Sequence, residues 1–484
     1  MSDFMAAKVD AYVDEVWPDV LADIHALVAV PSVSDPERAV PGAPFGAEVK
    51  QALDVALAQC ARLGMVTSDH GGNYGIAQVP YEDKDNAASP DGTPLVAVMS
   101  HVDVVPAGEG WDGDPFTVRV RDGWLIGRGV LDDKGPAVLS AYAARFFLET
   151  GTPLPYRLQL IIGCDEETGM SDVDHYLEEQ GEPDFLFTPD AVFPVCCGEK
   201  GRLVGTFASG VLSGDLRIVE MEGGTAVNAI PGSAWAKVHV MPDTELPEVE
   251  GFAFEPCPDA AVRIVACGIG GHASRPEGTV NAIGLLVDYL IDNDLAGEGE
   301  KPFLMLLHDV FASTDGSSLG VAATDPVFDP LTCIGGTIEL RDGHMLQTVD
   351  VRYPASIDDK QIAQRLQAKA AEYDATFACD PDLLMVPYVI DPNKPEVQAL
   401  VRAYNTVTHS DAKPTTLGGG TYARHFANAV SFGPIHDGST CPPWVGPMHG
   451  ANEGFSENAL KRALKIYIQA LLNLREVYRV NRCR

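Results

Sequence analysis

The segment PLVAVMSHVDVV (94–105) opens the part of the chain that decides the fold, and it is followed by GVLDDKGPAVLSAYAARFFLETG (129–151) and YRLQLIIGCDEE (156–167). The first and third segments are apolar runs that turn polar only at their carboxyl ends, which is typical of buried strands in a mostly parallel sheet. The middle segment has Pro136 near its start and Gly151 after its end, as expected of a helix. The order strand, helix, strand predicts an α/β sheet that binds ligands beyond the carboxyl ends of its strands.

Length and charge limit the possible organisation and partners. The 484 residues correspond to about three typical domains, so more than one folding unit is expected. The chain has 34 Lys and Arg against 69 Asp and Glu, a formal net charge of −35. Such a charge repels nucleic acid and attracts cations, so we expect no nucleic-acid partner. No apolar run reaches the roughly 18 residues of a membrane span, so we expect no membrane partner either.

The cysteines and the N-terminus indicate a cellular compartment. The ten cysteines include no CxxC pair, and the first 17 residues are acidic and amphipathic, unlike a signal peptide. We therefore expect free thiols and a cytoplasmic protein.

The pattern of the chain changes between residues 198 and 388. This region has short alternating segments separated by Gly and Asp turns, with a helix near 280–291, and it predicts a separate α+β domain. The flanking segments 1–197 and 389–484 would then form one α/β domain in two parts. Further helices are expected on either side of Pro18, over 49–60, over 397–408 and over 456–475.

His101 and Asp103 stand two residues apart at the end of the first predicted strand, so both side chains point to the same face. One could bind a metal ion while the other orients the imidazole ring. An ordinary His–Asp hydrogen bond without a metal is an equal alternative.

Carboxylates gather at two further positions. Asp132 and Asp133 begin the predicted helix, where helix capping would explain only one of them. Asp165, Glu166 and Glu167 end the second apolar strand, and three adjacent carboxylates repel one another unless cations or protons neutralise them. A solvated turn is the alternative. Because adjacent strand residues face opposite ways, one glutamate could bind metal while the other handles protons.

Asp190 and His449 complete the candidate set. Taken alone, Asp190 could belong to a surface loop and His449 could be structural. Together with the other residues they make a mixed nitrogen and oxygen donor set that fits two divalent ions, whereas a thiolate zinc site would need differently placed cysteines.

Several strings, in this order, resemble the PepV-type dipeptidases of the co-catalytic metallopeptidase superfamily, which includes carboxypeptidase G, aminoacylase and succinyl-diaminopimelate desuccinylase. They spread over roughly residues 95 to 455, and the resemblance rests on all of them together. The strings are SHVDVVPAGEGWDGDPF, GRGVLDDKGP, GCDEETGM, TPDAVFPV, GEKG, GHASRPEGTVNA, VDVRYP, LGGGTYAR and MHGANE.

The resemblance implies a ligand set for two divalent metal ions. Asp132 would bridge the ions, His101 and Asp190 would complete one shell, and Glu167 and His449 would complete the other. Zinc is the metal expected first, and manganese or cobalt would accept the same ligands. The family also tends to have a cis peptide bond after the bridging aspartate.

The resemblance also implies roles around the metals. Asp103 would hold the His101 ring, and Glu166 would be the general base. The region 198–388 would be the family's lid domain, which binds substrate. In it, His272 would contact the scissile carbonyl oxygen, although by itself it reads as a surface histidine.

Two lid residues would bind the substrate. Arg352 would grip its C-terminal carboxylate, or it could form an ordinary salt bridge with Asp350. Asn228 would approach the substrate near the metals, or it could simply form a turn.

The expected fold is thus a two-domain metallopeptidase, an α/β catalytic domain interrupted by an α+β lid. The expected activity is metal-dependent hydrolysis of dipeptides by a monomer whose partners are small peptides. The alternatives are an N-acyl-amino-acid deacylase or desuccinylase of the same superfamily and, more remotely, a non-catalytic metal-stabilised binding protein.

Overall fold

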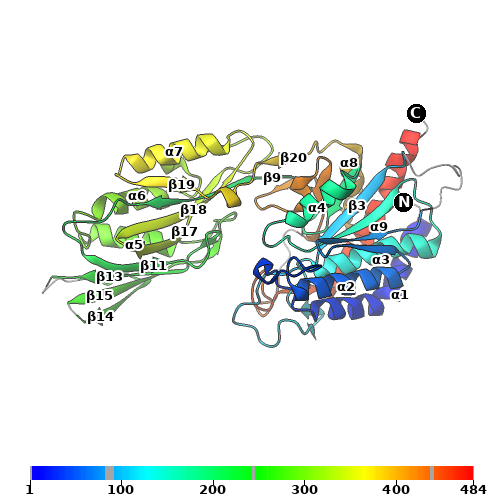
Figure 1. The fold of residues 1–484 in the computed structure, drawn as a ribbon, viewed down its shortest axis with the longest axis horizontal. Coiled ribbons are helices and arrows are strands. Elements are labelled where there is room, and N and C mark those ends of the chain that lie inside the picture. Colours follow the sequence, from blue (N-terminus) through cyan, green and yellow to red (C-terminus); the bar gives the residue numbers. More distant parts are fainter. Residues whose placement is uncertain (1–2, 82–91, 242–245, 259, 437–440, 483–484) are drawn as a thin grey trace. The chain divides into compact units, whose positions relative to one another are not determined.

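The computed structural model describes residues 3–81, 92–241, 246–258, 260–436 and 441–482 (Figure 1). The chain separates into two compact units. The first comprises 1–197, 390–415 and 420–484, and the second comprises 198–389 and 416–419. The second unit contains the segment 198–388 that is expected to form a separate domain, and it includes four further residues, 416–419, from the segment 389–484. They belong to the second unit because Leu417 and Gly418 offer their carbonyl oxygens to the Lys200 amide and the Arg352 guanidinium.

The first unit is built on a mixed sheet with the strand order β1-β2-β6-β3-β7-β22-β9. The four strands β6, β3, β7 and β22 are parallel, and antiparallel pairs extend the sheet at both sides. The predicted parallel sheet is therefore confirmed for its centre. The strand bounds are β1 Val66–His70, β2 Tyr74–Gln78, β3 Leu95–His101, β6 Arg157–Gly163, β7 Phe185–Thr188, β9 Cys196–Glu199 and β22 Ala429–Ser431.

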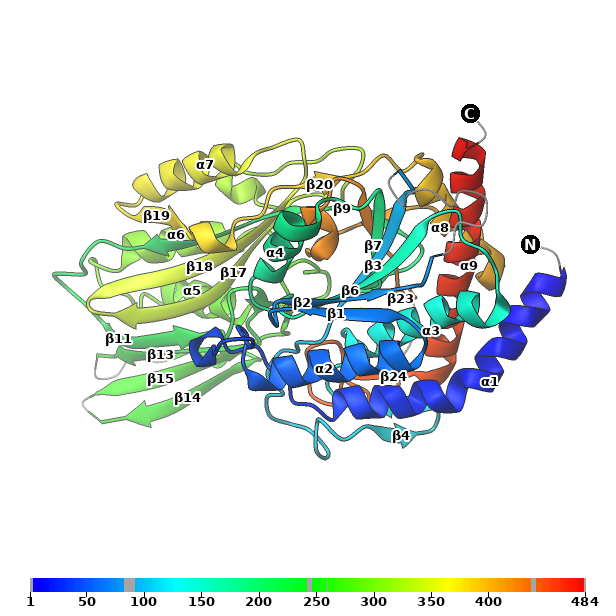
Figure 2. The same ribbon diagram turned by 45° about the vertical axis from the view of Figure 1, so that its right-hand side comes forward.

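Helices cover both faces of this sheet, as the buried pattern of its central strands requires (Figure 2). On one face α1 contacts α2 and α3, α9 contacts α1 and α3, and α8 packs on α9. On the other face, α4 and the short helix η4 share a hydrophobic cluster with the strands. The bounds are α1 Asp3–Val28, α2 Ala47–Arg62, α3 Lys134–Thr150, α4 Ser171–Gln180, α8 Pro395–Thr408, α9 Glu457–Arg482, η1 Pro36–Arg38 and η4 Tyr422–His425.

The expectation of two helices meeting at Pro18 was wrong, because α1 is one helix with Pro18 inside it. Pro18 is exposed, whereas Val16 and Val20 on either side of it are buried in the core. Burial of this continuous apolar face offsets the hydrogen bond that an interior proline removes. No helix in the described part of the chain has the length and apolar character needed to span a membrane.

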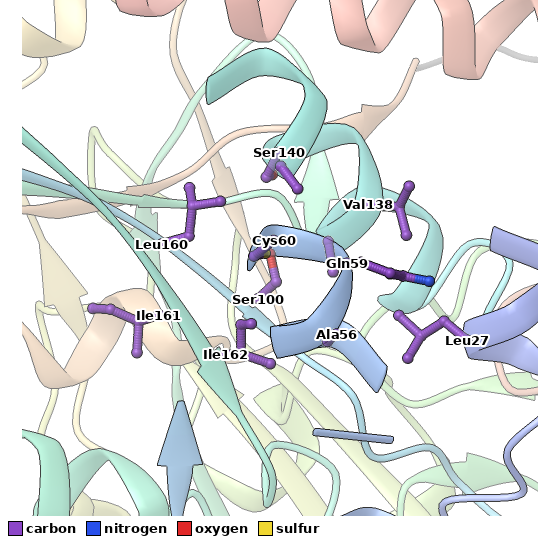
Figure 3. A pocket seen from close by; sticks show the side chains of 12 residues that line it. Leu27, Ala56, Gln59, Cys60, Ser100, Val138, Ser140, Leu160, Ile161 and Ile162 are labelled. Atoms are coloured by element: carbon purple, nitrogen blue, oxygen red, sulfur yellow. The ribbon is translucent and has the colours of Figure 1, made fainter. Parts of the chain in front are cut away.

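A small internal cavity of about 20 Å³ lies between the helices of one face and the sheet (Figure 3). It has room for about one water molecule and its lining is mainly apolar, so it is a gap in the core and not a substrate site. Labelled residues around it include Leu27 of α1, Cys60 of α2, Val138 of α3 and Ile162 of β6.

The second unit contains an antiparallel sheet with the order β14-β15-β13-β11-β17-β18-β10-β19. Helices α5, α6 and α7 contribute side chains to one hydrophobic core with these strands, which confirms the predicted α+β architecture. The bounds are β10 Gly201–Ala208, β11 Ile218–Gly223, β13 Ser233–His239, β14 Phe252–Cys257, β15 Ala261–Cys267, β17 Thr332–Arg341, β18 His344–Tyr353, β19 Thr376–Cys379, α5 Ala282–Asp292, α6 Lys301–Phe311, α7 Asp359–Ala371, η2 Ser317–Leu319 and η3 Pro381–Leu383.

Short strands connect distant parts of the chain. In the first unit, β24 pairs with β5, which pairs with β4, so the segment just after His449 lies beside the segment just before Asp132. In the second unit, β12 pairs with β16. The remaining bounds are β4 Arg119–Arg121, β5 Trp124–Ile126, β8 Ala191–Val192, β12 Ala229–Ile230, β16 Gly271–His272, β20 Tyr388–Val389, β21 Thr415–Leu417, β23 Pro434–Ile435 and β24 Gly454–Ser456.

Candidate metal centre

Polar side chains converge at the carboxyl ends of the central parallel strands. His101 is the last residue of β3 and pairs with Gly163, the last residue of β6. Glu166 and Glu167 follow β6, and Asp190 follows β7. In parallel strands these ends share one edge of the sheet, which is why residues far apart in sequence meet there.

Asp132 lies between the two histidines of the predicted set. Its Oδ1 is 3.0 Å from His101 Nε2, and its Oδ2 is 2.8 Å from His449 Nε2. On one side, His101 Nε2 is 3.7 Å from Asp190 Oδ2; on the other, His449 Nε2 is 3.2 Å from Glu167 Oε2. The structure thus brings all five predicted metal ligands together around one carboxylate.

Two groups of donor atoms in this cluster are close enough to hold a cation. His101, Asp132 and Glu167 form one group, and His101, Glu166 and Asp190 form the other, with donor atoms within 4.8 Å of one another in each. The donors are imidazole nitrogens and carboxylate oxygens, which suit zinc, manganese or cobalt. The residues present therefore fit divalent ions.

Hydrogen bonds hold the first histidine in place. His101 Nδ1 lies 3.1 Å from the backbone oxygen of Asp103 and 3.3 Å from its Oδ1. Asp133 directly precedes α3 at the N-cap position, yet its side chain makes no capping bond. Its Oδ2 instead accepts a hydrogen bond from the His101 amide at 3.1 Å. Capping therefore does not account for Asp133. The Asp132–Asp133 peptide bond is cis.

The cluster is crowded with negative charge, which shifts the pKa of both histidines upward. Burial lowers the pKa of His101, but the carboxylates of Asp103, Asp132 and Asp190 outweigh burial and raise it well above its usual value. Burial also opposes protonation of His449, but Asp132 and Glu167 raise its pKa to about 11. Protons on the histidines here neutralise the negative charge of the carboxylates, and bound divalent cations would take over this role.

The carboxyl groups respond to the same crowding. Burial, helped by the charge on Asp190, raises the pKa of Glu166 well above its usual value. Burial, helped by Asp132, raises the pKa of Glu167 to about 7. Burial would also raise the pKa of Asp132, but His101 and His449 outweigh it and hold this pKa below its usual value.

Supporting residues that sequence reasoning missed surround the glutamates. Asp172 Oδ2 accepts hydrogen bonds from the amides of Cys164 and Asp165, at 2.6 and 3.1 Å, and from the Tyr422 hydroxyl at 2.5 Å. Tyr422 also packs edge-on against the His101 ring. Tyr422 was within reach of the sequence, since it lies in LGGGTYAR, whereas Asp172 has no signal apart from its position at the start of a helix.

The other predicted site residues belong to the second unit. His272 in β16 pairs with Ala229 in β12, and the Asn228 carbonyl accepts a hydrogen bond from the Ala273 amide, so the His272 and Asn228 segments are neighbours. The Nδ1 atom of His272 lies 2.8 Å from the Ser274 hydroxyl. These contacts order the exposed histidine within its turn.

Arg352 forms the salt bridge that had been considered as its alternative role. Its Nε and Nη2 donate to the two carboxylate oxygens of Asp350 at 2.5 and 3.1 Å, and its Nη1 donates to the Gly418 carbonyl at 3.1 Å. Arg202 Nε also donates to Asp350, at 3.0 Å. One carboxylate is thus shared by two guanidinium groups, and the three side chains together keep a positive charge.

Residues 97–473 match the family model described as peptidase family M20/M25/M40. A Staphylococcus aureus (strain bovine RF122 / ET3-1) protein named "Putative dipeptidase SAB1611c" is 29% identical over 483 residues, covering 96% of this chain and 98% of that protein. The Bacillus subtilis (strain 168) protein "Putative dipeptidase YtjP" is 28% identical over 472 residues, covering 94% and 97%.

Solved structures show the same fold. Human carnosine dipeptidase 1 aligns with a TM-score of 0.58 at 16% identity, covering 98% of this chain and 99% of that one. At such low identity the likeness establishes the fold alone. The family model, which spans well over half of the chain, shows that the protein belongs to peptidase family M20/M25/M40 and is a hydrolase that acts on peptide bonds.

Proposed function

We propose that this protein hydrolyses dipeptides with the help of two divalent metal ions, zinc being the first expected. One observation carries the proposal: the two carboxylate oxygens of Asp132 face different histidines, each with its own second carboxylate. This arrangement suits a bridging ligand. His101 and Asp190 would complete one site, and Glu167 and His449 the other. The names of the two bacterial relatives support dipeptides as substrates.

The protein residues would divide the work of the reaction. When bound, the two ions would supply Lewis acidity to the attacking water and to the scissile carbonyl. Glu166 would take a proton from the water and deliver it to the leaving amine. Asp103 would keep the His101 ring oriented, as its contacts with Nδ1 suggest.

The second unit would act as the substrate-binding lid. His272 would stabilise negative charge on the scissile carbonyl oxygen, and Asn228 in the neighbouring segment would contact the substrate close by. Arg352 would bind the substrate's C-terminal carboxylate. The positive charge that Arg352 and Arg202 keep beside Asp350 supports this role, because it favours an incoming anion.

A substrate screen with metal titration tests the proposal. Metal-free protein is supplied with zinc, manganese or cobalt and assayed on dipeptides, tripeptides and N-acetyl and N-succinyl amino acids. We expect metal-dependent cleavage of dipeptides and much slower cleavage of the other classes. Preferred cleavage of the acylated amino acids would replace the dipeptidase by a deacylase or desuccinylase. Two-ion binding without hydrolysis of any amide would contradict the catalytic role.

We also propose that the enzyme works as a monomer in the cytoplasm. Cys60, Cys164 and Cys333 are buried free thiols, which suits a reducing compartment. Cys483 lies outside the described residues. Sedimentation of the metal-loaded protein as a dimer would contradict the monomer.

A further inference from the structure

A buried ion pair lies behind the candidate metal centre. Arg128 follows β5 and is 1% exposed, and Glu453 precedes β24 and is fully buried. Arg128 Nη1 lies 2.5 Å from Glu453 Oε2. Neither residue was assigned a role from the sequence, although both lie in strings of the family resemblance, GRGVLDDKGP and MHGANE.

Arg128 holds the loop that carries His449. Its Nη2 donates to the carbonyl oxygen of His449 at 3.0 Å and to those of Pro106 and Ala107 at 3.3 and 3.2 Å. The guanidinium also lies over the Trp111 ring, 5.3 Å from its centre. One side chain thus joins the loop after β3 to the loop before β24.

Glu453 holds the segment that leads to Asp132. Its Oε1 accepts hydrogen bonds from the amides of Gly129 and Leu131 at 2.9 and 3.2 Å, and its backbone oxygen accepts one from Gly127 at 2.9 Å. Asp132 is the next residue along the chain. The ion pair therefore touches the backbone on both sides of the His449–Asp132 contact.

His449 needs such support because its own packing is weak. Its side chain is 49% exposed, and its backbone has a φ of +64°, in the left-handed region that non-glycine residues rarely adopt. Apart from the contacts of its Nε2 atom with Asp132 and Glu167, the position of the ring depends on the groups that bind the His449 main chain. The Arg128 guanidinium is such a group, because it donates to the His449 carbonyl.

We propose that Arg128 and Glu453 are positioning residues that set the affinity of one of the two cation sites, the one formed by His449, Glu167 and Asp132. The inference rests on the proposed two-metal function. Removing one partner of a buried ion pair also destabilises the fold, so the test must separate a change in cation affinity from a general loss of stability. Removing such an outer partner of a metal ligand typically weakens metal binding about 10- to 100-fold.

Calorimetric titration of metal-free full-length protein with Zn²⁺ alone, repeated with Co²⁺, tests this inference without measuring activity. We expect two binding events for the unchanged protein. In Glu453→Gln and Arg128→Gln one event should weaken about 10- to 100-fold while the other stays within about threefold. Arg128→Lys, which keeps the charge but loses the planar fork, should fall in between.

Two further variants separate positioning from general destabilisation. Tyr156→Phe removes a fully buried hydrogen bond to the Leu471 carbonyl, away from these loops, and should lower the melting temperature without changing either event. His449→Ala should weaken the same event as Arg128→Gln. A variant that combines His449→Ala with Arg128→Gln should bind the cation no more weakly than His449→Ala alone, because both changes act through one ligand.

Each outcome decides the inference. Selective, non-additive weakening supports it. The inference would be overturned by unchanged cation affinities in Glu453→Gln or by equal weakening of both binding events. It would also be overturned if Tyr156→Phe weakened cation binding in proportion to its lower melting temperature. Each of these results would leave the proposed function standing. Fewer than two binding events in the unchanged protein would remove the two-metal function and this inference with it.

Discussion

Glu166 and Glu167 are neighbours in the chain but have different surroundings. Glu167 Oε2 lies 3.2 Å from His449 Nε2, and its amide donates to Asp103 Oδ2 at 3.1 Å. Glu166 instead groups with His101 and Asp190. This difference between adjacent side chains is the basis for giving them different chemical roles.

Replacing Glu166 by Gln should lower kcat by about 100- to 10,000-fold, because an amide cannot accept the proton from water. Both metal ions should still bind. The matched change Glu167→Gln should instead weaken one metal-binding event. Steady-state kinetics and metal analysis of both variants check this, and near-normal turnover of Glu166→Gln would refute the general-base assignment.

Replacing Arg352 by Gln should raise KM for dipeptides with a free carboxylate by about 10-fold or more, the usual value of a hydrogen bond to a charged group. Dipeptide amides, which lack that carboxylate, should be affected much less. The comparison variant Arg202→Gln leaves Arg352 in place and should change KM less. An equal effect on acids and amides would contradict a carboxylate clamp.

At this scale the sequence could predict which residue types gather but not every contact between them. His101 and Glu167 were recognisable because polar residues ended apolar strands. Asp172 and Glu453 were not, since each accepts hydrogen bonds from main-chain amides, which no pattern of side chains shows. The pairing of Arg352 with Asp350 was foreseen only as one of two alternatives.

At the scale of elements, α1 shows how core packing prevails over local propensity. The sequence places a helix breaker at Pro18, but Val13, Trp17 and Ile24 are buried on one continuous face. Local signals at the ends of helices were more reliable. Gly151 directly follows the end of α3, as predicted, and it takes the left-handed conformation there.

Replacing Pro18 by Ala should stabilise the protein by about 1 to 3 kcal/mol, because it restores a helix donor and removes a ring clash at an exposed position. Thermal unfolding measures the change. The exposed neighbouring substitution Asp19→Ala is the control and should have little effect. A lower melting temperature for Pro18→Ala would contradict the prediction.

At the scale of the whole molecule, one half-buried histidine, His436, links stability to pH. Burial, helped by the charge of Arg462, lowers the pKa of His436 to about 4. In the unfolded chain this histidine has a pKa of about 6.5, so between about pH 4 and pH 6.5 it is protonated there but neutral in the folded chain. The stability that depends on the neutral ring is therefore complete above about pH 6.5 and is lost as the pH falls towards 4.

Between pH 7.5 and pH 5.5 this histidine should cost the folded state about 1 kcal/mol. His436→Phe keeps an aromatic ring beside Phe193 and Tyr404 but removes the titratable group. This variant should therefore lose less stability than the unchanged protein when the pH falls from 7.5 to 5.5. Urea unfolding at the two pH values measures both. His308, whose pKa is raised by its hydrogen bond to Asp288, should give the opposite sign when replaced by Asn. Identical pH slopes for His436→Phe and the unchanged protein would contradict the prediction.

The parallel pairing of β22 with β7 has a consequence for the nascent chain. Residues 185–188 leave the ribosome first, and their partners at 429–431 are translated roughly 240 residues later. At about 5 to 20 residues per second, an apolar strand edge waits on the order of 10 to 50 s for its neighbour. During that interval the unpaired edge of β7 can pair with a wrong strand. We therefore expect efficient production of this enzyme to depend on chaperones that cover partly formed sheets.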